Sequence, residues 1–329
     1  MNVGSWSDRR VFVTGATGLV GSWLVRELVD QGAYVVVLVR DWDPQSELIR
    51  SGTIYRPHVV HGRLEDYMTL ERAINEHEVD TVFHLGAQTI VGTALRSPLP
   101  TFEANIRGTY NLLEACRMHA KLVQRIVVAS SDKAYGEVAN LPYTEDMPPL
   151  GRHPYDVSKS CADLLAQAYY QTYGTPVVVA RCGNIFGGGD LNWSRIVPGT
   201  IRSLYYGQCP VIRSDGRYTR DYLYIMDAVM AYLAAAEAVG RPGVAGEAFN
   251  FAPEQPRSVL EVVDVLRQLM DRTDLEPIIL NEAKAEIRDQ YLSAEKAWTM
   301  LGWRPRYSFE AGLRATVDWY KEFFSGRAQ

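Results

Sequence analysis

Residues 10–32, RVFVTGATGLVGSWLVRELVDQG, decide the fold class. The run from Arg10 to Thr14 is short, apolar and β-branched, which is typical of a buried strand. The turn GATGLVG follows it, and the helical pattern of residues 22–31 comes next. Gly32 ends that helix, as a glycine after the last helical turn commonly does. A strand, a glycine turn and a helix in this order predict the first unit of a doubly wound parallel sheet.

The alternation of strands and helices continues to residue 180. Continuous apolar runs fit a parallel sheet that helices cover on both faces. Such runs lie at 34–39, 59–60, 81–85, 125–129 and 176–180, and helical patterns lie between them at 69–77, 101–119 and 156–173. We therefore predict an α/β fold, a Rossmann-type doubly wound parallel sheet.

The sequence changes in character after Arg181. The segment GNIFGGGD, residues 183–190, is a glycine-rich loop, and no linker rich in proline or serine sets the following part apart. Short strands are expected at 211–212, 249–250 and 278–280, and helices at 194–206, 227–238, 258–271, 293–301 and 309–324. We expect one continuous body in which the sheet carries a smaller C-terminal α/β lobe.

The composition argues against several classes of protein. The chain has 329 residues, of which 47% are hydrophobic and 22% charged, as is usual for soluble globular proteins. Its net charge of −5 provides no basic excess for a nucleic-acid backbone, so we expect no nucleic-acid partner. The most apolar helical run, Ala228–Ala236, is shorter than the ~18 residues that span a bilayer, so we expect no membrane segment.

The spacing of cysteines and histidines indicates the cellular compartment and whether a metal site is present. The N-terminus lacks the apolar core of a signal peptide, and the cysteines form no CxxC pair. We expect free thiols and a cytoplasmic protein; the residues concerned are Cys116, Cys161, Cys182 and Cys209. The six histidines show no HExxH or paired spacing, so we expect no metal site.

Gly15, Gly18 and Gly21 form a GxxGxxG pattern between the first strand and its helix. Glycine at these points allows a tight turn and a close approach of the backbone to a pyrophosphate. The helix N-terminus then offers free N–H groups and a positive dipole end to the anion. A turn without a ligand is the alternative, but the strand–turn–helix context favours a dinucleotide site.

The end of the second strand bears on which dinucleotide binds. An acidic residue there would bind the ribose 2′-hydroxyl of NAD. The chain instead has Arg40, which suits the 2′-phosphate of NADP, and then Asp41, which still suits the ribose. We predict NAD(P), with a preference for NADP.

Tyr155 and Lys159 form a YxxxK pair at the start of a predicted helix. Four residues make about one helical turn, so both side chains lie on one face. A neighbouring ammonium lowers the pKa of a phenol, and a phenolate is a useful general base for a substrate hydroxyl. Ser131, at the end of the strand 125–129, would hydrogen-bond the same substrate oxygen.

With these pieces in order, the chain resembles the extended short-chain dehydrogenases/reductases, in their nucleotide-sugar epimerase/dehydratase branch. The matching segments cover nearly the whole chain: VTGATGLVG (13–21), HLGAQ (84–88), NIRGTYNLLEA (105–115), SSDKAYG (130–136), PYDVSKSCAD (154–163), RCGNIFGGGD (181–190), RDYLYIMDA (220–228) and LGWRP (301–305). The resemblance implies an NAD(P)-binding Rossmann domain at 1–182 with about 221–252. It implies a nucleotide-sugar-binding lobe at 183–220 and 253–329.

The resemblance also implies roles for single residues. Tyr155 would take a sugar hydroxyl proton while a hydride passes to the nicotinamide, and Lys159 would hold the nicotinamide ribose. The implied cofactor residues are Gly15, Thr17, Gly18, Leu19, Val20, Arg40, Asp41, Arg63, Leu64, Leu85, Gly86, Ala87, Tyr155 and Lys159. The implied substrate residues are Thr93, Asn184, Arg195, Val211, Arg220 and Arg288, with Lys284 as the alternative to Arg288.

Several of these assignments have a second interpretation. Arg63 stands in Gly62-Arg63-Leu64, where the family has a segment like Gly-Asp-Leu, so it either adds positive charge near an NADP phosphate or is simply exposed. Val211 packs near the nucleobase or belongs to the core. Asn105 either caps a helix or anchors the active-site backbone, and we take Glu145 as structural.

The segment Ser131-Asp132-Lys133 points to the reaction. It resembles the Thr/Ser-Asp-Lys of CDP-glucose 4,6-dehydratases and the acid–Lys pair of C5-inverting UDP-sugar dehydratases. Oxidation at C4 acidifies the C5 proton, which Lys133 would remove, while Asp132 would protonate the departing C6 hydroxyl. We therefore predict an NDP-sugar 4,6-dehydratase, a lyase whose catalytic residues are Ser131, Asp132, Lys133, Tyr155 and Lys159.

Three alternatives remain open at this point. The main one is a 4-epimerase acting on an NDP-hexose or NDP-uronic acid, which would use the same Tyr155 and Lys159. Asp132 and Lys133 would then form a structural ion pair. The second alternative is a regulator that has lost catalysis, which is disfavoured because Tyr155 and Lys159 are both present. The third is a reductase, which stoichiometric oxidation of its cofactor would reveal.

Two amphipathic helices predict a homodimer. In the family that the chain resembles, the helices corresponding to 101–119 and 156–173 pair with those of a second subunit in a four-helix bundle. The alternative is that other parts of the same chain cover the apolar faces of these helices. Their apolar residues include Leu112, Leu113, Cys116, Leu164, Leu165 and Ala168.

Overall fold

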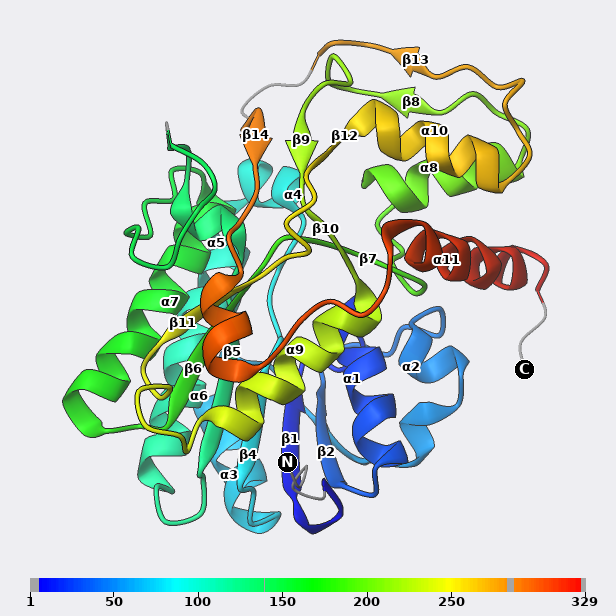
Figure 1. Ribbon diagram of the computed structural model, residues 1–329. Coiled ribbons are helices and arrows are strands. Elements are labelled where there is room, and N and C mark those ends of the chain that lie inside the picture. The colour runs from blue at the N-terminus through cyan, green and yellow to red at the C-terminus, as the bar shows by residue number, and fades with distance from the viewer. Residues whose placement is uncertain (1–5, 139, 283–286, 327–329) are drawn as a thin grey trace.

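Seven parallel strands form the central sheet of the computed structural model, which describes residues 6–138, 140–282 and 287–326 (Figure 1). In sheet order they are β11 (Ala248–Phe251), β6 (Val177–Cys182), β5 (Arg125–Ala129), β4 (Thr81–His84), β1 (Arg10–Thr14), β2 (Tyr34–Val39) and β3 (His58–His61). The order runs outward from β1 in both directions, which is the doubly wound arrangement. The predicted fold class is confirmed.

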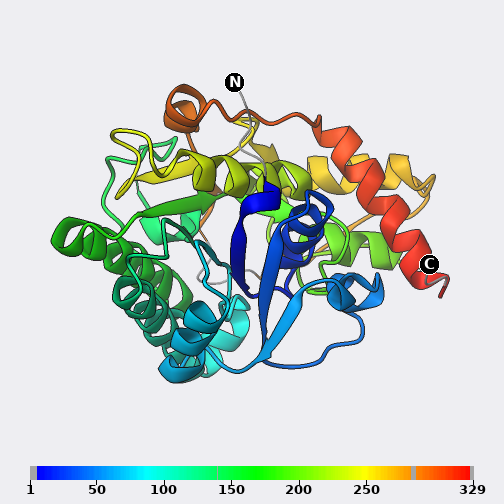
Figure 2. The same ribbon diagram turned by 90° about the horizontal axis from the view of Figure 1, so that it is seen from below.

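Helices cover both faces of this sheet because alternate strand residues point to opposite sides. Val11 and Val13 of β1 pack with α1 (Leu19–Asp30) and α9 (Ile225–Ala238). Phe12, between them, faces the other layer. That layer contains α3 (Tyr67–Glu76), α6 (Gly108–Met118) and α7 (Pro154–Tyr173), and Figure 2 shows helices on each side of the sheet.

A smaller lobe packs beyond the carboxyl ends of the strands (Figure 1). Its core joins α8 (Ile196–Tyr205), α10 (Val259–Leu269) and α11 (Phe309–Phe324). Three small sheets complete it: β7 (Asn184–Phe186) with β10 (Tyr222–Tyr224); β12 (Arg257–Ser258), β9 (Thr219–Arg220) and β14 (Asp289–Gln290); and β13 (Ile278–Ile279) with β8 (Val211–Ile212). The remaining short elements are η1 (Trp6–Asp8), α2 (Glu47–Arg50), η2 (Thr53–Tyr55), α4 (Val91–Arg96) and η4 (Asp132–Tyr135).

Two predicted helices differ from the structure. The helix expected at 101–119 is three segments, α5 (Pro98–Phe102), the π-helix η3 (Glu103–Arg107) and α6. The helix expected at 293–301 begins only at Glu295 and consists mainly of the π-helix η5 (Ala297–Leu301). It begins later than predicted because Ser293 donates its backbone N–H to the carbonyl of Tyr143, next to the bridge between Tyr143 and Leu292.

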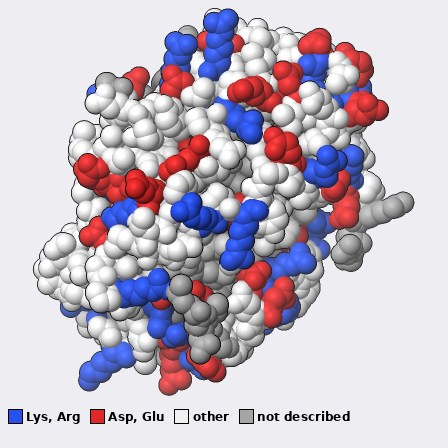
Figure 3. Space-filling view, viewed as in Figure 1, with Lys and Arg blue, Asp and Glu red and all other residues white. Residues whose placement is uncertain are grey.

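No described helix is both long and apolar enough to cross a membrane. On the face seen in Figure 3, basic and acidic side chains are interspersed and do not form a field of one sign.

The turn between β1 and α1 is packed too closely for any side chain at Gly21. A Cβ atom there would lie 2.1 Å from the carbonyl oxygen of Gly15. We expect Gly21→Ala to lower the free energy of unfolding by about 1–3 kcal/mol, because the backbone must shift to admit the methyl group. Urea unfolding monitored by circular dichroism measures this.

Gly240→Ala is the matched control. A Cβ at Gly240 meets no atom within 4 Å, so the change should stay within about 0.5 kcal/mol. Equal stability of the two variants would contradict the close packing of the turn.

Candidate functional site

A cleft of about 1290 Å³ lies between the carboxyl ends of the strands and the smaller lobe. The β1–α1 turn, the segment after β4 and the segment after β5 line it from the sheet side. Arg195, Val211 and Arg220 line it from the lobe. Open α/β sheets bind ligands at this edge, so the cleft is the candidate site.

The β1–α1 turn has the shape that a dinucleotide requires. Gly15 has a φ of +71°, and a Cβ there would lie 2.6 Å from the backbone nitrogen of Gly86. Gly18 is the extended N-cap of α1 and lines the cleft, so the helix N-terminus faces the cavity without an intervening side chain. These residues fit the pyrophosphate of NAD(P).

Nearly all the residues predicted for the cofactor site lie in the cleft wall: Gly15, Thr17, Gly18, Leu19, Val20, Arg40, Asp41, Leu64, Leu85, Gly86, Ala87, Tyr155 and Lys159. Arg63 does not. Its side chain is exposed and lies 3.9 Å from Glu65. Of its two interpretations, simple exposure is the one that the structure supports.

Arg40 and Asp41 bond to one another. Arg40 Nε lies 2.5 Å from Asp41 Oδ2, and both side chains are exposed at the end of β2. Arg40, which suits NADP, and Asp41, which suits NAD, thus form one ion pair in the cleft wall.

Ser131, Lys133, Tyr155 and Lys159 meet in the same cleft. Ser131 caps η4 at the end of β5, and both its side chain and that of Tyr155 on α7 line the cleft. Lys159 donates to the carbonyl of Ala129 at 2.8 Å. The sequence therefore identified side chains that the fold brings together.

The protonation of this pair differs from the sequence prediction. Burial raises the pKa of Tyr155 to about 12, although the charge of Arg195 opposes the shift. Burial lowers the pKa of Lys159 to about 8. The prediction that the Lys159 ammonium holds the phenol pKa down is wrong for this structure: the charge that opposes the shift is that of Arg195, and burial outweighs it.

Asp132 and Lys133 point to different partners. The Asp132 carboxylate is 2% exposed, does not line the cleft and accepts from Ser131 Oγ at 2.9 Å. Burial raises its pKa, with the charge of Lys133 opposing. Lys133 Nζ instead donates to Gln290 Oε1 at 3.1 Å. Since the ion pairs of the described residues do not include Asp132 with Lys133, the structural ion-pair interpretation is wrong.

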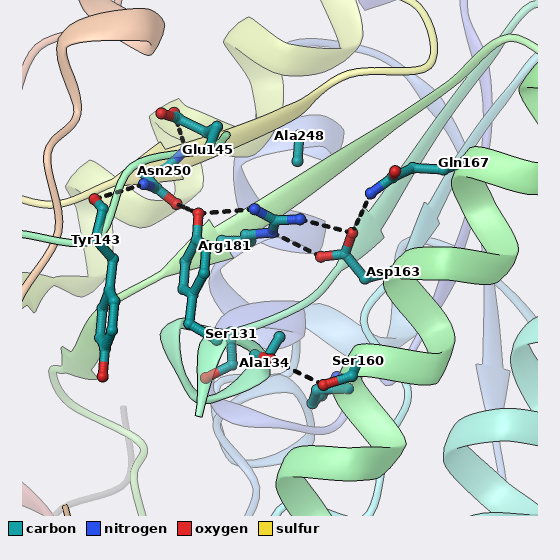
Figure 4. Close-up of polar contacts among 12 residues, drawn as sticks. Ser131, Ala134, Tyr143, Glu145, Ser160, Asp163, Gln167, Arg181, Ala248 and Asn250 are labelled. Atoms are coloured by element: carbon teal, nitrogen blue, oxygen red, sulfur yellow. Dashed lines mark hydrogen bonds and ion pairs between the residues drawn. The ribbon is translucent and has the colours of Figure 1, made fainter. Parts of the chain in front are cut away.

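A buried polar network holds η4 in place (Figure 4). We call Asp163, Arg181, Tyr135 and Asn250 the Arg181 network. Arg181 pairs with Asp163 at 2.7 and 2.9 Å and donates to the Tyr135 hydroxyl at 2.7 Å. Tyr135 in turn donates to Asn250 Oδ1 at 2.7 Å. The network therefore joins α7, β6, η4 and β11 at fixed distances.

Two further side chains tie the neighbouring backbone together, as Figure 4 shows for Glu145. Glu145 accepts from the backbone N–H of Asn250 at 2.8 Å, so its structural assignment holds. Asn105 lies inside η3, where its side chain bonds both backbone groups of Gln88, at 2.7 and 3.0 Å, and Ser158 Oγ at 2.9 Å. The helix-cap interpretation of Asn105 is wrong, and the anchoring interpretation is the one observed.

The predicted substrate residues divide into two groups. Those in the cleft wall are Thr93, Asn184, Arg195, Val211 and Arg220. Arg220 is buried and donates to the carbonyls of Thr219 and Arg288 at 2.7 Å each. Arg288 is exposed and is not among the described residues that line the cleft. Lys284 lies outside the described residues.

Two residues that the sequence analysis did not single out lie beside the catalytic candidates. Asp156 is buried, lines the cleft and has a pKa raised by burial, which Lys133 and His153 oppose. Its place next to Tyr155 was the available signal. Gln290 is buried against Lys133. No local motif marks it, because it reaches the site through the pairing of β14 with β9.

Comparison with known proteins agrees with this geometry. The model of the NAD-dependent epimerase/dehydratase family matches residues 11–252. The CDP-glucose 4,6-dehydratase of Salmonella typhimurium is 30% identical over 98% of this chain and 93% of its own.

Solved structures include both activities. The dTDP-glucose 4,6-dehydratase of Streptomyces venezuelae, with NAD and TYD bound, has a TM-score of 0.87 at 27% identity, covering 96% of this chain and 98% of that chain. The UDP-glucose 4-epimerase of Thermotoga maritima, with UDP-glucose, has a TM-score of 0.87 at 28% identity, covering 95% and 99%. This chain is therefore an enzyme that belongs to the NAD-dependent epimerase/dehydratase family.

Proposed function

We propose that this enzyme is an NDP-sugar 4,6-dehydratase, which converts an NDP-hexose to an NDP-4-keto-6-deoxyhexose. The observation that carries the proposal is Ser131-Asp132-Lys133 on η4, next to Tyr155 and Lys159. A buried carboxyl and an amine beside the oxidising pair are the groups that elimination of water requires. The relative from Salmonella typhimurium carries the same activity in its name.

We assign the two parts of the chain different ligands. Residues 1–182 with about 221–252 bind NAD(P), and 183–220 with 253–329 bind the nucleotide sugar. Support comes from the glycine turn on the sheet side and from Arg195 on the lobe side of one cleft. Arg195 already pairs with Asp190 at 3.0 Å, so a diphosphate would have to compete with that carboxylate.

The first half of the reaction oxidises C4. Tyr155 takes the proton of the C4 hydroxyl, and Ser131 holds the same oxygen through a hydrogen bond. Arg195 assists because its charge lowers the phenol pKa. Bound NAD(P) supplies the acceptor for the C4 hydride and the source of the hydride that later reaches C6.

The second half removes water. Lys133 Nζ takes the C5 proton, the C6–oxygen bond breaks and a C5–C6 double bond forms. Asp132 supplies the proton that turns the departing hydroxide into water, passing it through the Ser131 hydroxyl that it contacts. Burial raises the pKa of Asp132, which favours the protonated form that this step requires. Lys133 would return its proton to C5 as the hydride that bound NAD(P) would supply reaches C6, which completes the 4-keto-6-deoxy product.

The second candidate is a 4-epimerase acting on an NDP-hexose or NDP-uronic acid. The equal TM-score of the Thermotoga maritima epimerase favours it. It needs Tyr155 and Lys159 but no acid or base at C5 and C6, so it leaves Asp132 and Lys133 without a chemical role.

We also place the enzyme in the cytoplasm. All four cysteines are free thiols: Cys116, Cys161, Cys182 and Cys209. Reducing compartments keep cysteines in this form.

Product mass separates the two candidates. We expect CDP-, UDP-, GDP- or dTDP-hexose, incubated with enzyme as purified, to yield a product lighter by one water in mass spectrometry. Asp132→Asn should slow water loss about 100-fold or more, because the proton donor is removed, yet still oxidise C4. Absorbance of the reduced nicotinamide in a single turnover reports that oxidation.

Asp156→Asn is the matched control, since Asp156 is also buried near Lys133. It should keep water loss within about threefold of the wild type. If Asp156→Asn loses dehydration and Asp132→Asn does not, the acid is Asp156. A new 4-epimer of unchanged mass would establish the epimerase instead.

We further propose that the cofactor is NADP, bound through Arg40 after it leaves Asp41. Mass spectrometry of the nucleotide released from the denatured enzyme should find NADP, and Arg40→Ala should shift the bound population to NAD. Arg63→Ala, outside the cleft, is the control and should change nothing. NAD alone in the wild type would refute the preference.

Finally, we propose a homodimer through α5, α6 and α7. Leu112, Leu113 and Cys116 are buried inside the subunit, so they cannot form the contact. Exposed apolar side chains remain on each helix, namely Leu99, Tyr110 and Leu164. Within the subunit, α7 packs directly against α5 and α6, and all three helices contact η3.

Light scattering tests the dimer. The wild type should have twice the subunit mass, and Leu164→Glu should give monomers because a charge would be buried in the contact. Tyr55→Glu, at an exposed site on η2, is the control. A wild-type monomer at working concentration would reject the proposal.

A further inference from the structure

Gln290 reaches Lys133 from the smaller lobe. Its Oε1 accepts from Lys133 Nζ at 3.1 Å, and the side chain is 0% exposed. The two residues are 157 positions apart in the chain. A contact of this kind exists only when the lobe is packed against η4.

The backbone around Gln290 is held on both sides. β14 pairs with β9, where Gln290 lies opposite Arg220. The next carbonyl, of Tyr291, accepts from Tyr143 N at 2.9 Å, and Leu292 N donates to Asp221 at 2.9 Å. Gln290 is therefore a rigid reference point for the flexible lysine side chain.

The chemistry of this acceptor suits a lysine that must act as a base. The charged groups that interact with Lys133 are Asp132 on η4 and Asp156 on α7, while Arg220 on β9 acts on Asp132. The hydrogen-bond partner of Lys133 is nevertheless a neutral amide. An amide oxygen fixes the direction of the amine without the full charge that favours the ammonium form.

The other end of the same amide supports a role beyond packing. Gln290 Nε2 is buried and has no hydrogen-bond partner among the described residues. A buried N–H without a partner destabilises the fold, and such groups in native proteins often have a functional cause. A methionine of similar length would fill the space without that cost.

We propose that Gln290 is a positioning residue for dehydration, which aims the Lys133 amine at the sugar C5 and keeps it without a carboxylate partner. The inference rests on the proposed 4,6-dehydratase function. It assigns to the smaller lobe a part in the elimination step in addition to substrate binding.

Gln290→Glu and Gln290→Met test this with full-length enzyme and the NDP-hexose that the wild type dehydrates. Gln290→Glu should slow water loss on the order of tenfold at neutral pH and move the acid limb of the kcat profile to higher pH, because a carboxylate favours the ammonium form of Lys133. Gln290→Met should lower kcat without moving the profile and without raising KM.

Both variants should keep single-turnover oxidation at C4 within about twofold, since Tyr155 and Lys159 are untouched. Exchange of the C5 proton with deuterated solvent should fall in parallel with water loss. Gln268→Glu, on the exposed side of α10, adds the same charge to the lobe as a control and should behave as the wild type.

Three results would overturn the inference. One is a Gln290→Glu profile identical to that of the wild type with full water loss. Another is an equal loss of oxidation and elimination in Gln290→Met, which would mean a purely structural residue. Both leave the proposed function intact. A wild type that never loses water removes the proposed function, and the inference with it.

Discussion

The buried ion pair between Asp163 and Arg181 is the constraint on which the site depends. It lies between α7 and β6, and through Tyr135 it reaches η4 and β11. Tyr155 and Lys159 project from α7, whereas Asp132 and Lys133 project from η4. Two charges with almost no exposure are costly to bury, and removing one partner would strand the other. The pair therefore fixes the relative position of the groups that oxidise the sugar and those that we propose eliminate water.

This arrangement explains how one family contains two reactions. The Rossmann sheet, the glycine turn and the Tyr155–Lys159 pair are suited to oxidation at C4 in either case. The groups that we propose for dehydration lie on η4, a single turn of helix beside that pair, and Gln290 from the lobe contacts one of them. Relatives of both activities consequently have equal structural similarity to this chain, and chemistry has to be argued from the residues on η4.

The sequence predicted those features that depend on neighbouring residues. Continuous apolar runs located the strands of the sheet because such a run is visible within a few consecutive residues. Short motifs located Ser131, Tyr155 and Lys159 in the same way. Features that depend on distant contacts could not be predicted. The partner of Lys133, the pairing of Arg40 with Asp41 and the position of Arg63 outside the cleft are examples. The contact of Asn105, inside the π-helix η3, with Gln88 after β4 is a further example. The Tyr155 pKa was misjudged because burial, which the spacing does not report, dominates it.

The path of the chain between sheet and lobe has a consequence for engineering. After β6 the chain enters the lobe through β7, returns to the sheet with α9 and β11, and enters the lobe again with β12. After β14 it returns to the sheet once more, where η5 packs with α9 and β11, and it ends in the lobe with α11. The two parts are thus joined by five crossings, not by one linker, and exchanging the lobe for that of a relative means making five compatible splices. Change of specificity is accordingly easier through single residues in the cleft wall than through recombination of whole lobes.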